Sequence, residues 1–137
     1  MTYLRPPLFV RRVFNPLAMR FEIGGATTLT VTGRRSGKPH ALPVIPVDHG
    51  GSRYLMSTRG DADWVRNLRE PEASGELRHR GGGSTSSFRA IEVPVGERPP
   101  IITAYRSVAG RAVASYFKAL PDPADHPVFR IEPDQGA

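Results

Sequence analysis

Six short runs rich in β-branched, aliphatic or aromatic residues alternate along the chain with glycines and prolines, as strands alternate with turns. These runs cover residues 27–32, 41–47, 53–58, 75–80, 86–95 and 128–131. Paired or tripled glycines separate two pairs of neighbouring runs, so these pairs are expected to be antiparallel, and the first three runs to form a meander. The pattern predicts a mainly β protein.

Other stretches follow a helical period instead. Residues 62–69 carry an apolar face, and Asp61 is predicted to be the N-cap of that helix. Residues 99–117 begin with two prolines and continue with apolar residues at helical spacing, with a kink expected at Gly110. The N-terminal segment, residues 1–24, mixes apolar residues with arginines and predicts an amphipathic helix.

The alternation of strand and helix that builds doubly wound sheets is missing, so six strands with short helices predict a small antiparallel barrel of the α+β type. A chain of 137 residues is long enough for one such domain. We expect the barrel over residues 25–133, between the N-terminal segment and a short tail at 134–137.

Composition excludes several kinds of chemistry. There is no cysteine, so disulfides, thiolate metal sites and cysteine nucleophiles are ruled out, and the four histidines have no metal-ligand spacing. Arginines interrupt the N-terminal segment, which therefore lacks the apolar core of a signal peptide, and no run reaches the ~20 apolar residues of a membrane span. A cytoplasmic protein is expected.

The formal charge is +6, and all but two of the basic residues are arginines. Arginine binds phosphate and carboxylate groups through its planar fork, so this balance favours an anionic partner: nucleic acid, a membrane surface or an acidic small ligand. Most arginines outside the motifs, Arg98 among them, are expected on a solvated face.

Residues 32–39 concentrate this charge between two predicted strands. The segment reads Thr-Gly-Arg-Arg-Ser-Gly-Lys-Pro, and Gly33 and Gly37 are expected to take positive φ and to turn backbone N–H groups toward a ligand. A phosphate-binding loop of the Walker type would need a longer glycine spacing and a following helix. The segment therefore predicts an anion-binding hairpin turn.

Five motifs in order resemble the deazaflavin-dependent nitroreductase family of actinobacteria over about residues 25–133. They are the turn at 32–39, Leu-Pro-Val at 42–44, Ser-Thr-Arg-Gly at 57–60, Asp-Trp-Val-Arg-Asn-Leu at 63–68, and His-Pro-Val-Phe-Arg-Ile-Glu-Pro at 126–133. The resemblance implies a six-stranded split β-barrel with peripheral helices that binds coenzyme F420. This flavin-like two-electron carrier has a tail with a phosphate and a chain of glutamates.

The resemblance also implies a set of cofactor-binding residues. The basic turn and the loop at 57–60 would hold the tail, residues 40–45 would line the ring, and two residues would follow on the helix. The whole set is Gly33, Arg34, Arg35, Ser36, Lys38, His40, Ala41, Leu42, Pro43, Val44, Ile45, Met56, Ser57, Thr58, Arg59, Trp64 and Asn67. From the residues alone, the single tryptophan of a small barrel, here Trp64, is usually a core aromatic, and Asn67 is expected to be a solvated or capping amide.

The implied reaction is a hydride transfer from reduced F420 to a small unsaturated, quinone-like or nitroaromatic substrate, with the product protonated by solvent. No catalytic side chain is predicted. Tyr105, Tyr116, His40 and His126 remain candidate hydrogen-bond or proton donors, although such histidines are more often surface residues.

Three alternatives stay open at this point. One is a split barrel that binds FMN, and a second is a lipid carrier or membrane-surface protein that uses residues 1–21. The third is a single-stranded nucleic-acid binder with Phe9, Phe14, Tyr54 or Phe88 as stacking platforms, which is disfavoured because the aromatics fall on predicted core faces. We therefore expect a small-molecule substrate and no nucleic-acid partner, with a homodimer open because split barrels often pair.

Overall fold

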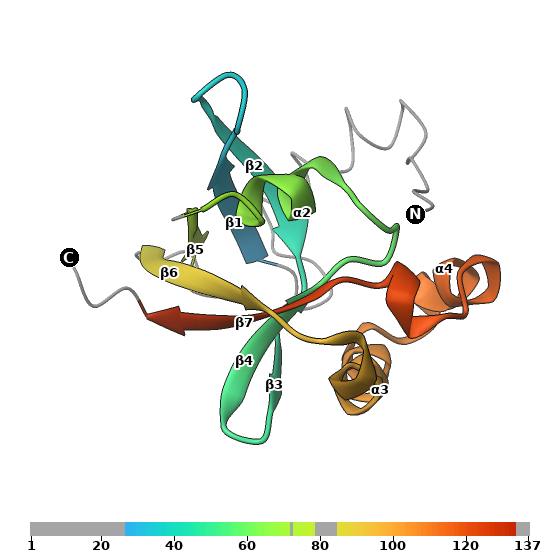
Figure 1. The fold of residues 1–137 in the computed structure, drawn as a ribbon. Helices are drawn as coiled ribbons and strands as arrows, with labels where there is room; N and C mark the ends of the chain where they lie inside the picture. Colours follow the sequence, from blue (N-terminus) through green and yellow to red (C-terminus); the bar gives the residue numbers. More distant parts are fainter. Residues whose placement is uncertain (1–26, 72, 79–84, 134–137) are drawn as a thin grey trace.

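One curled antiparallel sheet forms the body of the protein (Figure 1). The structure, a computed structural model, describes residues 27–71, 73–78 and 85–133; the predicted N-terminal segment, the glycine turn at 81–83 and the tail lie outside this part. The seven strands are β1 (Thr27–Thr32), β2 (Pro39–Val44), β3 (Val47–His49), β4 (Ser52–Met56), β5 (Ser74–Arg78), β6 (Thr85–Glu92) and β7 (Val128–Pro133).

The order of the strands is β2-β1-β5-β6-β7-β4-β3. Although β2 and β3 follow each other directly in the chain, they lie at opposite ends of this order. The sheet must therefore curl back on itself, which gives the partly closed barrel that was predicted. The antiparallel, mainly β class is confirmed.

The prediction of six strands was one too few, because residues 41–47 are divided. Val44, at the end of β2, pairs with Thr27 of β1, whereas Val47 begins β3 and pairs with Tyr54 of β4. Pro46 lies between them; it has no N–H to donate and restricts the residue before it, so the ladder with β1 stops there. The middle strand of the predicted meander thus changes partner halfway.

Short helices close the two sides of the barrel. They are α2 (Asp63–Leu68), α3 (Pro99–Ala109) and α4 (Ala114–Ala119), with 3₁₀ turns η3 (Val95–Glu97), η4 (Gly110–Val113) and η5 (Pro123–Asp125). The predicted break at Gly110 is confirmed, because this residue has a φ of +67° and ends α3. The predicted N-cap was wrong: Ala62 occupies that position without a side-chain cap, and the carboxylate of Asp61 binds Arg69 instead.

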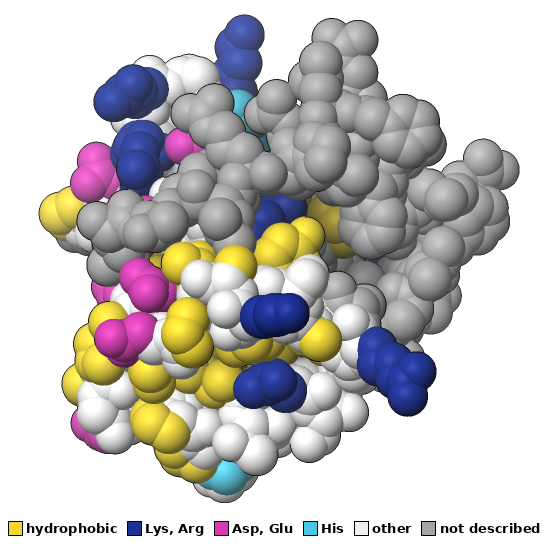
Figure 2. Space-filling view, turned by 90° about the vertical axis from the view of Figure 1, so that its right-hand side faces the viewer, with side chains coloured by type: hydrophobic (Ala, Val, Ile, Leu, Met, Phe, Trp, Pro, Cys, Tyr) yellow, Lys and Arg dark blue, Asp and Glu magenta, His cyan; other side chains and the backbone are white. Residues whose placement is uncertain are grey.

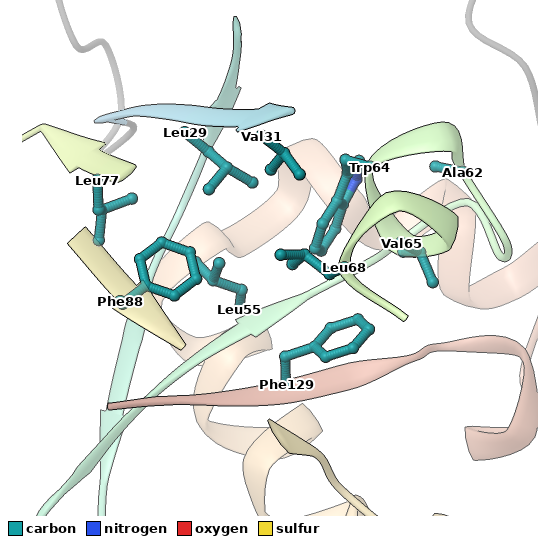
Figure 3. Packing of buried hydrophobic residues seen from close by; sticks show 10 residues of the cluster. All are labelled: Leu29, Val31, Leu55, Ala62, Trp64, Val65, Leu68, Leu77, Phe88 and Phe129. Carbon is teal, nitrogen blue, oxygen red and sulfur yellow. The ribbon is translucent and has the colours of Figure 1, made fainter. Parts of the chain in front are cut away.

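Two apolar clusters lie on opposite faces of the sheet. The cluster inside the barrel is formed by Leu29, Val31, Leu55, Ala62, Trp64, Val65, Leu68, Leu77, Phe88 and Phe129 (Figure 3). Met56, next to Leu55 in β4, points to the other face and packs under α3 with Ile101 and Tyr105. Because α2 contributes four buried side chains, it is fixed against the barrel, and so are the segments at its two ends.

Candidate functional site

The β1–β2 turn is closed by its own backbone. The N–H of Gly33 donates to the carbonyl of Lys38 at 2.8 Å, and the N–H of Gly37 donates to the carbonyl of Gly33 at 2.9 Å. Gly37 has the predicted positive φ of 69°. Gly33 does not, and a Cβ there would lie 2.7 Å from both His40 Nε2 and Ser36 Oγ. A larger residue in place of Gly33 would therefore require the exposed side chains of Ser36 and His40 to move, whereas Gly37 is favoured by its dihedral angle.

Most N–H groups of the turn are used internally rather than presented to a ligand. Besides the two above, the N–H of Lys38 donates to Ser36 Oγ at 3.1 Å, and that of Arg34 donates to Asn67 Oδ1 at 3.1 Å. Within the described part of the chain, the amides of Arg35 and Ser36 are the ones in this turn that have no partner. Anion binding by the turn must therefore rest mainly on its side chains.

Arg34 is tied to α2. Its Nη1 donates to Asn67 Oδ1 at 2.8 Å, and its Nη2 lies 3.9 Å from the exposed carboxylate of Asp63. Asn67 is buried, so its interpretation as a solvated or capping amide was wrong. By contrast, the side chains of Arg35 and Lys38 are exposed and form no ion pair with any described residue.

The outer edge of β2 is open among the described residues, since β2 ends the sheet order. The bond from Gly33 to Lys38 sets which residues of β2 bond to β1. Counting in steps of two from Lys38, they are His40, Leu42 and Val44. The N–H and C=O of Ala41 and the C=O of Pro43 consequently point away from β1, toward the open edge.

The loop between β4 and α2, residues 57–62, is braced by the buried Ser57. Its N–H donates to the carbonyl of Pro127 at 2.9 Å, and its hydroxyl donates to the carbonyl of Gly60 at 2.6 Å. Gly60 also accepts the N–H of Ala62 at 2.9 Å. Arg59, between these anchors, is half-buried and has no hydrogen bond or ion pair within the described residues. The serine thus holds the loop, and the arginine is left unpaired.

His126 supports the same loop from behind. It is fully buried, with Nδ1 3.0 Å from the carbonyl oxygen of Ser57 and Nε2 2.5 Å from that of Leu120, and its ring packs on Phe117. The expectation of a surface position was wrong for this histidine, while His40 is indeed exposed. Because a carbonyl faces each nitrogen, His126 is built into the fold and is not placed to donate a proton to a ligand.

Tyr105 lies on α3 and is buried in the apolar cluster under that helix. Burial raises the pKa of its phenol to about 12, and the nearby charge of Arg59 acts in the opposite direction. The hydroxyl makes no hydrogen bond to any described residue. It remains protonated at neutral pH and able to donate, whereas Tyr116 lies half-buried at the margin of the cluster under α3.

The structure separates the predicted site residues into two groups. Apart from the buried Gly33, Ser57 and Gly60, the residues of the turn, β2 and the loop at 57–60 are exposed or half-buried, whereas Met56 and Trp64 point into the two apolar clusters. The half-buried Leu42 and Val44 pack against the barrel cluster, and Ile45 packs against the cluster under α3. Figure 2 shows basic side chains at the upper end of the molecule, the height at which Figure 1 places the β1–β2 turn.

A group of charged residues near the loop at 57–62 was not predicted. Arg98, expected on a solvated face, is 5% exposed, and its guanidinium donates to the carbonyl of Val93 at 2.9 Å and to Glu92 at 3.1 Å. Glu92 also binds Arg69, and Arg69 binds Asp61. No periodicity in the sequence joins these positions, because the pairing of Arg69 with Glu92 spans 23 residues.

Two further searches concern the described residues only. No three histidine, aspartate or glutamate side chains come together there in a way that could hold a metal ion. None of the helices in this part is long and apolar enough to span a membrane.

Solved structures with similar folds were found, while a comparison with curated proteins gave no match. A protein of unknown function, Atu2129 from Agrobacterium tumefaciens, matches 95% of this chain with a TM-score of 0.57 and 20% identity, and the chain covers 58% of that protein. A chain described as a domain-swapped dimer matches 93%, is itself covered completely, and has a TM-score of 0.59 at 20% identity. At these identities the likeness concerns the fold.

A third solved structure, an F420-H2 dependent reductase named FDR-A, has a TM-score of 0.55 and 23% identity over 79% of this chain and 94% of its own. The sequence itself also matches a family. Residues 8–118 match the family F420H(2)-dependent quinone reductase, which is most of the chain and includes the basic turn, β2, the loop at 57–62 and α2. The chain therefore belongs to the F420H2-dependent quinone reductase family and is an oxidoreductase whose cofactor is coenzyme F420.

Proposed function

We propose that this chain reduces a quinone-like acceptor with reduced F420 and that Arg35, Lys38 and Arg59 bind the anionic tail of the coenzyme. The observation that carries the proposal is the state of these cations. None of the three forms an ion pair with a described residue, although the turn and the loop that bear them are both fixed to α2.

A phosphate and several carboxylates need cations held at defined positions. Arg34 supplies the fixation, because Asn67 anchors both its backbone and its side chain at α2. Arg35 and Lys38 then extend into solvent from a turn that cannot swing freely. Arg59 comes from a loop whose first residue is buried and bonded on both sides. Fixed backbone with unpaired charge suits a polyanionic ligand.

The ring of the coenzyme would lie along β2. A planar heterocycle with polar edges needs backbone donors and acceptors beside an apolar surface. The open N–H and C=O of Ala41 supply the former, while the half-buried side chains of Leu42, Val44 and Ile45 supply the latter. His40 and Pro43 belong to the same strand segment. The outer edge of this segment has no strand partner within the described residues.

When bound, the reduced coenzyme supplies the hydride from ring carbon C5. What the chain contributes is orientation of the acceptor and exclusion of water. The neutral phenol of Tyr105 is a candidate hydrogen-bond donor to an acceptor oxygen that gains charge during the transfer. No side chain is assigned as an acid or base, since solvent can protonate the reduced product.

The test is a titration of the purified protein with oxidised F420, followed by fluorescence, for the wild type and for Arg35→Ala and Arg59→Ala. Each substitution should weaken binding about tenfold or more, corresponding to about 1.4 kcal/mol for a lost charged contact. Arg89→Ala is the matched control, because Arg89 on β6 is exposed, as Arg35 is, and forms no ion pair with a described residue. It should bind as the wild type does.

Turnover then sorts the acceptors. Oxidation of reduced F420 should be fastest with a benzoquinone and slower with a nitroaromatic or a cyclic enone. Tighter binding of FMN than of F420 would replace the cofactor assignment by the FMN alternative, and absence of binding to either would reject the proposal. A cytoplasmic location, contact of residues 1–21 with a membrane surface and pairing into a homodimer stay predictions.

A further inference from the structure

Four charged side chains form a continuous network beside the barrel: Asp61, Arg69, Glu92 and Arg98, here called the Glu92 network. The guanidinium of Arg69 grips Glu92 with two bonds, of 2.9 and 2.7 Å, and reaches Asp61 at 2.9 Å. Arg98 approaches the same Glu92 carboxylate at 3.1 Å. The two arginines and two carboxylates balance in charge, and the side chains are only 5 to 31% exposed.

The network continues through backbone carbonyls to His126. Nη1 of Arg98 donates to the carbonyl of Pro123 at 3.2 Å and lies 3.5 Å from that of His126. The ring of His126 in turn lies against the carbonyl of Ser57 at 3.0 Å. The chain of contacts that starts at Asp61 therefore returns to Ser57, four residues earlier in the sequence.

The contacts form a closed circuit around one short loop. Both ends of residues 57–61 are fixed, one by His126 and the other by Arg69, and the fixing groups are joined to each other through Arg98 and Glu92. Arg59 stands in the middle of this loop and takes no part in the circuit. A network that ends on both sides of an unpaired cation can position that cation.

We infer that the Glu92 network is a positioning device for Arg59, and that its residues set the affinity for coenzyme F420 without touching it. The inference rests on the proposed function for the role of Arg59. Residues 57–61 belong to neither apolar cluster, so the conformation of this loop depends on the bonded groups at its ends. Releasing one end lets Arg59 sample other positions, and the bound state must then restore the lost order.

The first test is a double-mutant cycle on F420 binding. Asp61→Asn and Glu92→Gln keep the size of each side chain and remove its charge. In a protein that retains Arg59, each substitution should raise the Kd for F420 about five- to tenfold. In the Arg59→Ala protein, the same substitution should raise the Kd by less than about twofold, because the effects of coupled residues are non-additive. Glu92→Gln gives the more stringent test, because Glu92 lies outside the loop and can affect Arg59 only through the network. An equal effect with and without Arg59 would overturn the inference.

The second test needs no coenzyme. The backbone amides of Ser57 and Ala62 donate to the carbonyls of Pro127 and Gly60. Their hydrogen exchange should become about tenfold faster in Asp61→Asn and in Glu92→Gln. Asp48→Asn, which removes an exposed carboxylate from another arginine pair, should leave both amides unchanged. Unchanged exchange in Glu92→Gln would overturn the positioning role.

These tests also separate the two proposals. If the wild-type protein failed to bind F420 while the exchange rates changed as expected, the proposed function would be rejected. The conclusion that the Glu92 network fixes the loop would be retained. If F420 bound tightly and the Glu92→Gln protein bound it equally well, the proposed function would stand and the further inference would fall.

Discussion

Both the β1–β2 turn and the Glu92 network contain arginines, but those of the network are paired with carboxylates and Arg35 of the turn is not, within the described residues. In the network, Arg69 and Arg98 share the carboxylate of Glu92 at 2.7 and 3.1 Å. In the turn, Arg35 is exposed and forms no ion pair with a described residue. Arg34, its neighbour, lies 3.9 Å from the carboxylate of Asp63, which is 87% exposed.

The difference shows how a chain with a net charge of +6 divides its arginines. Asp61 and Glu92 neutralise the two arginines of the Glu92 network, whereas Arg35, Lys38 and Arg59 have no carboxylate partner among the described residues. Unpaired cations that lie close together repel each other and cost folding stability, but they raise the local concentration of anions. Arginines paired in this way stabilise the fold, and those left unpaired are available to a ligand.

The largest loss of unfolding free energy is expected from a substitution that breaks the Glu92 network. Arg98→Met leaves Glu92 with one partner and removes the donors to the carbonyls of Val93 and Pro123. Loss of one member of a buried ion pair costs about 3–5 kcal/mol of unfolding free energy, and we expect the lower end because Glu92 is 30% exposed. Urea unfolding measures it.

The matched control for that substitution is Arg35→Met, which makes the same change at the turn. An exposed residue without partners should alter the unfolding free energy by no more than about 0.5 kcal/mol. Equal losses of unfolding free energy in Arg98→Met and Arg35→Met would show that the arginines of the two regions contribute equally to stability. The contrast between the two regions would then be wrong.

The next effect concerns the buried phenol of Tyr105. The pKa of Tyr105 is raised from 10.0 to about 12 in the folded protein, so the folded state holds its proton more tightly than the unfolded state does. The resulting stability is complete below pH 10 and is lost as the pH rises toward 12, by about 2 kcal/mol. Urea unfolding at both ends of this range should show the loss in the wild type and a smaller one in Tyr105→Phe.

Asn67→Ala is expected to have a smaller effect on stability and a clear one on binding. The buried Oδ1 accepts two bonds from Arg34, and its loss leaves the Arg34 N–H without that partner, at a cost of about 1–2 kcal/mol. F420 binding should weaken because the turn is released from α2. Asn67→Asp, which keeps the acceptor, should retain most of the affinity; weakening as large as in the alanine variant would contradict the anchoring role.

Local signals predicted most of the fold. β-branched runs located the strands, and the glycine at 110 located the helix break. The additional strand was missed because apolar residues continue through Pro46, and the exchange of partners there depends on closure of the barrel. The wrong N-cap has a similar cause, since the Asp61 carboxylate found a stronger partner in Arg69, eight residues away.

The candidate site could be located from the sequence, but the division of labour within it could not. The motifs indicated both loops. Whether an arginine there is free depends on acceptors supplied by distant segments, as Asn67 does for Arg34 over 33 positions. The burial of Arg98 and His126 depends likewise on segments brought together only by the folded sheet.

The smallest expected effect tests the exposed counterpart of the network. Arg53 holds Asp48 across the β3–β4 turn with bonds of 2.8 and 3.2 Å, but the side chains are 50% and 70% exposed. The hydrogen bonds from Arg53 lower the pKa of Asp48, so the pair contributes stability above pH 3.8 that is lost as the pH falls through the lowered value. Solvent screening limits Asp48→Asn to about 0.5 kcal/mol near neutral pH. A loss as large as that in Arg98→Met, measured by the same urea unfolding, would mean that bond geometry rather than burial decides what an arginine pair contributes.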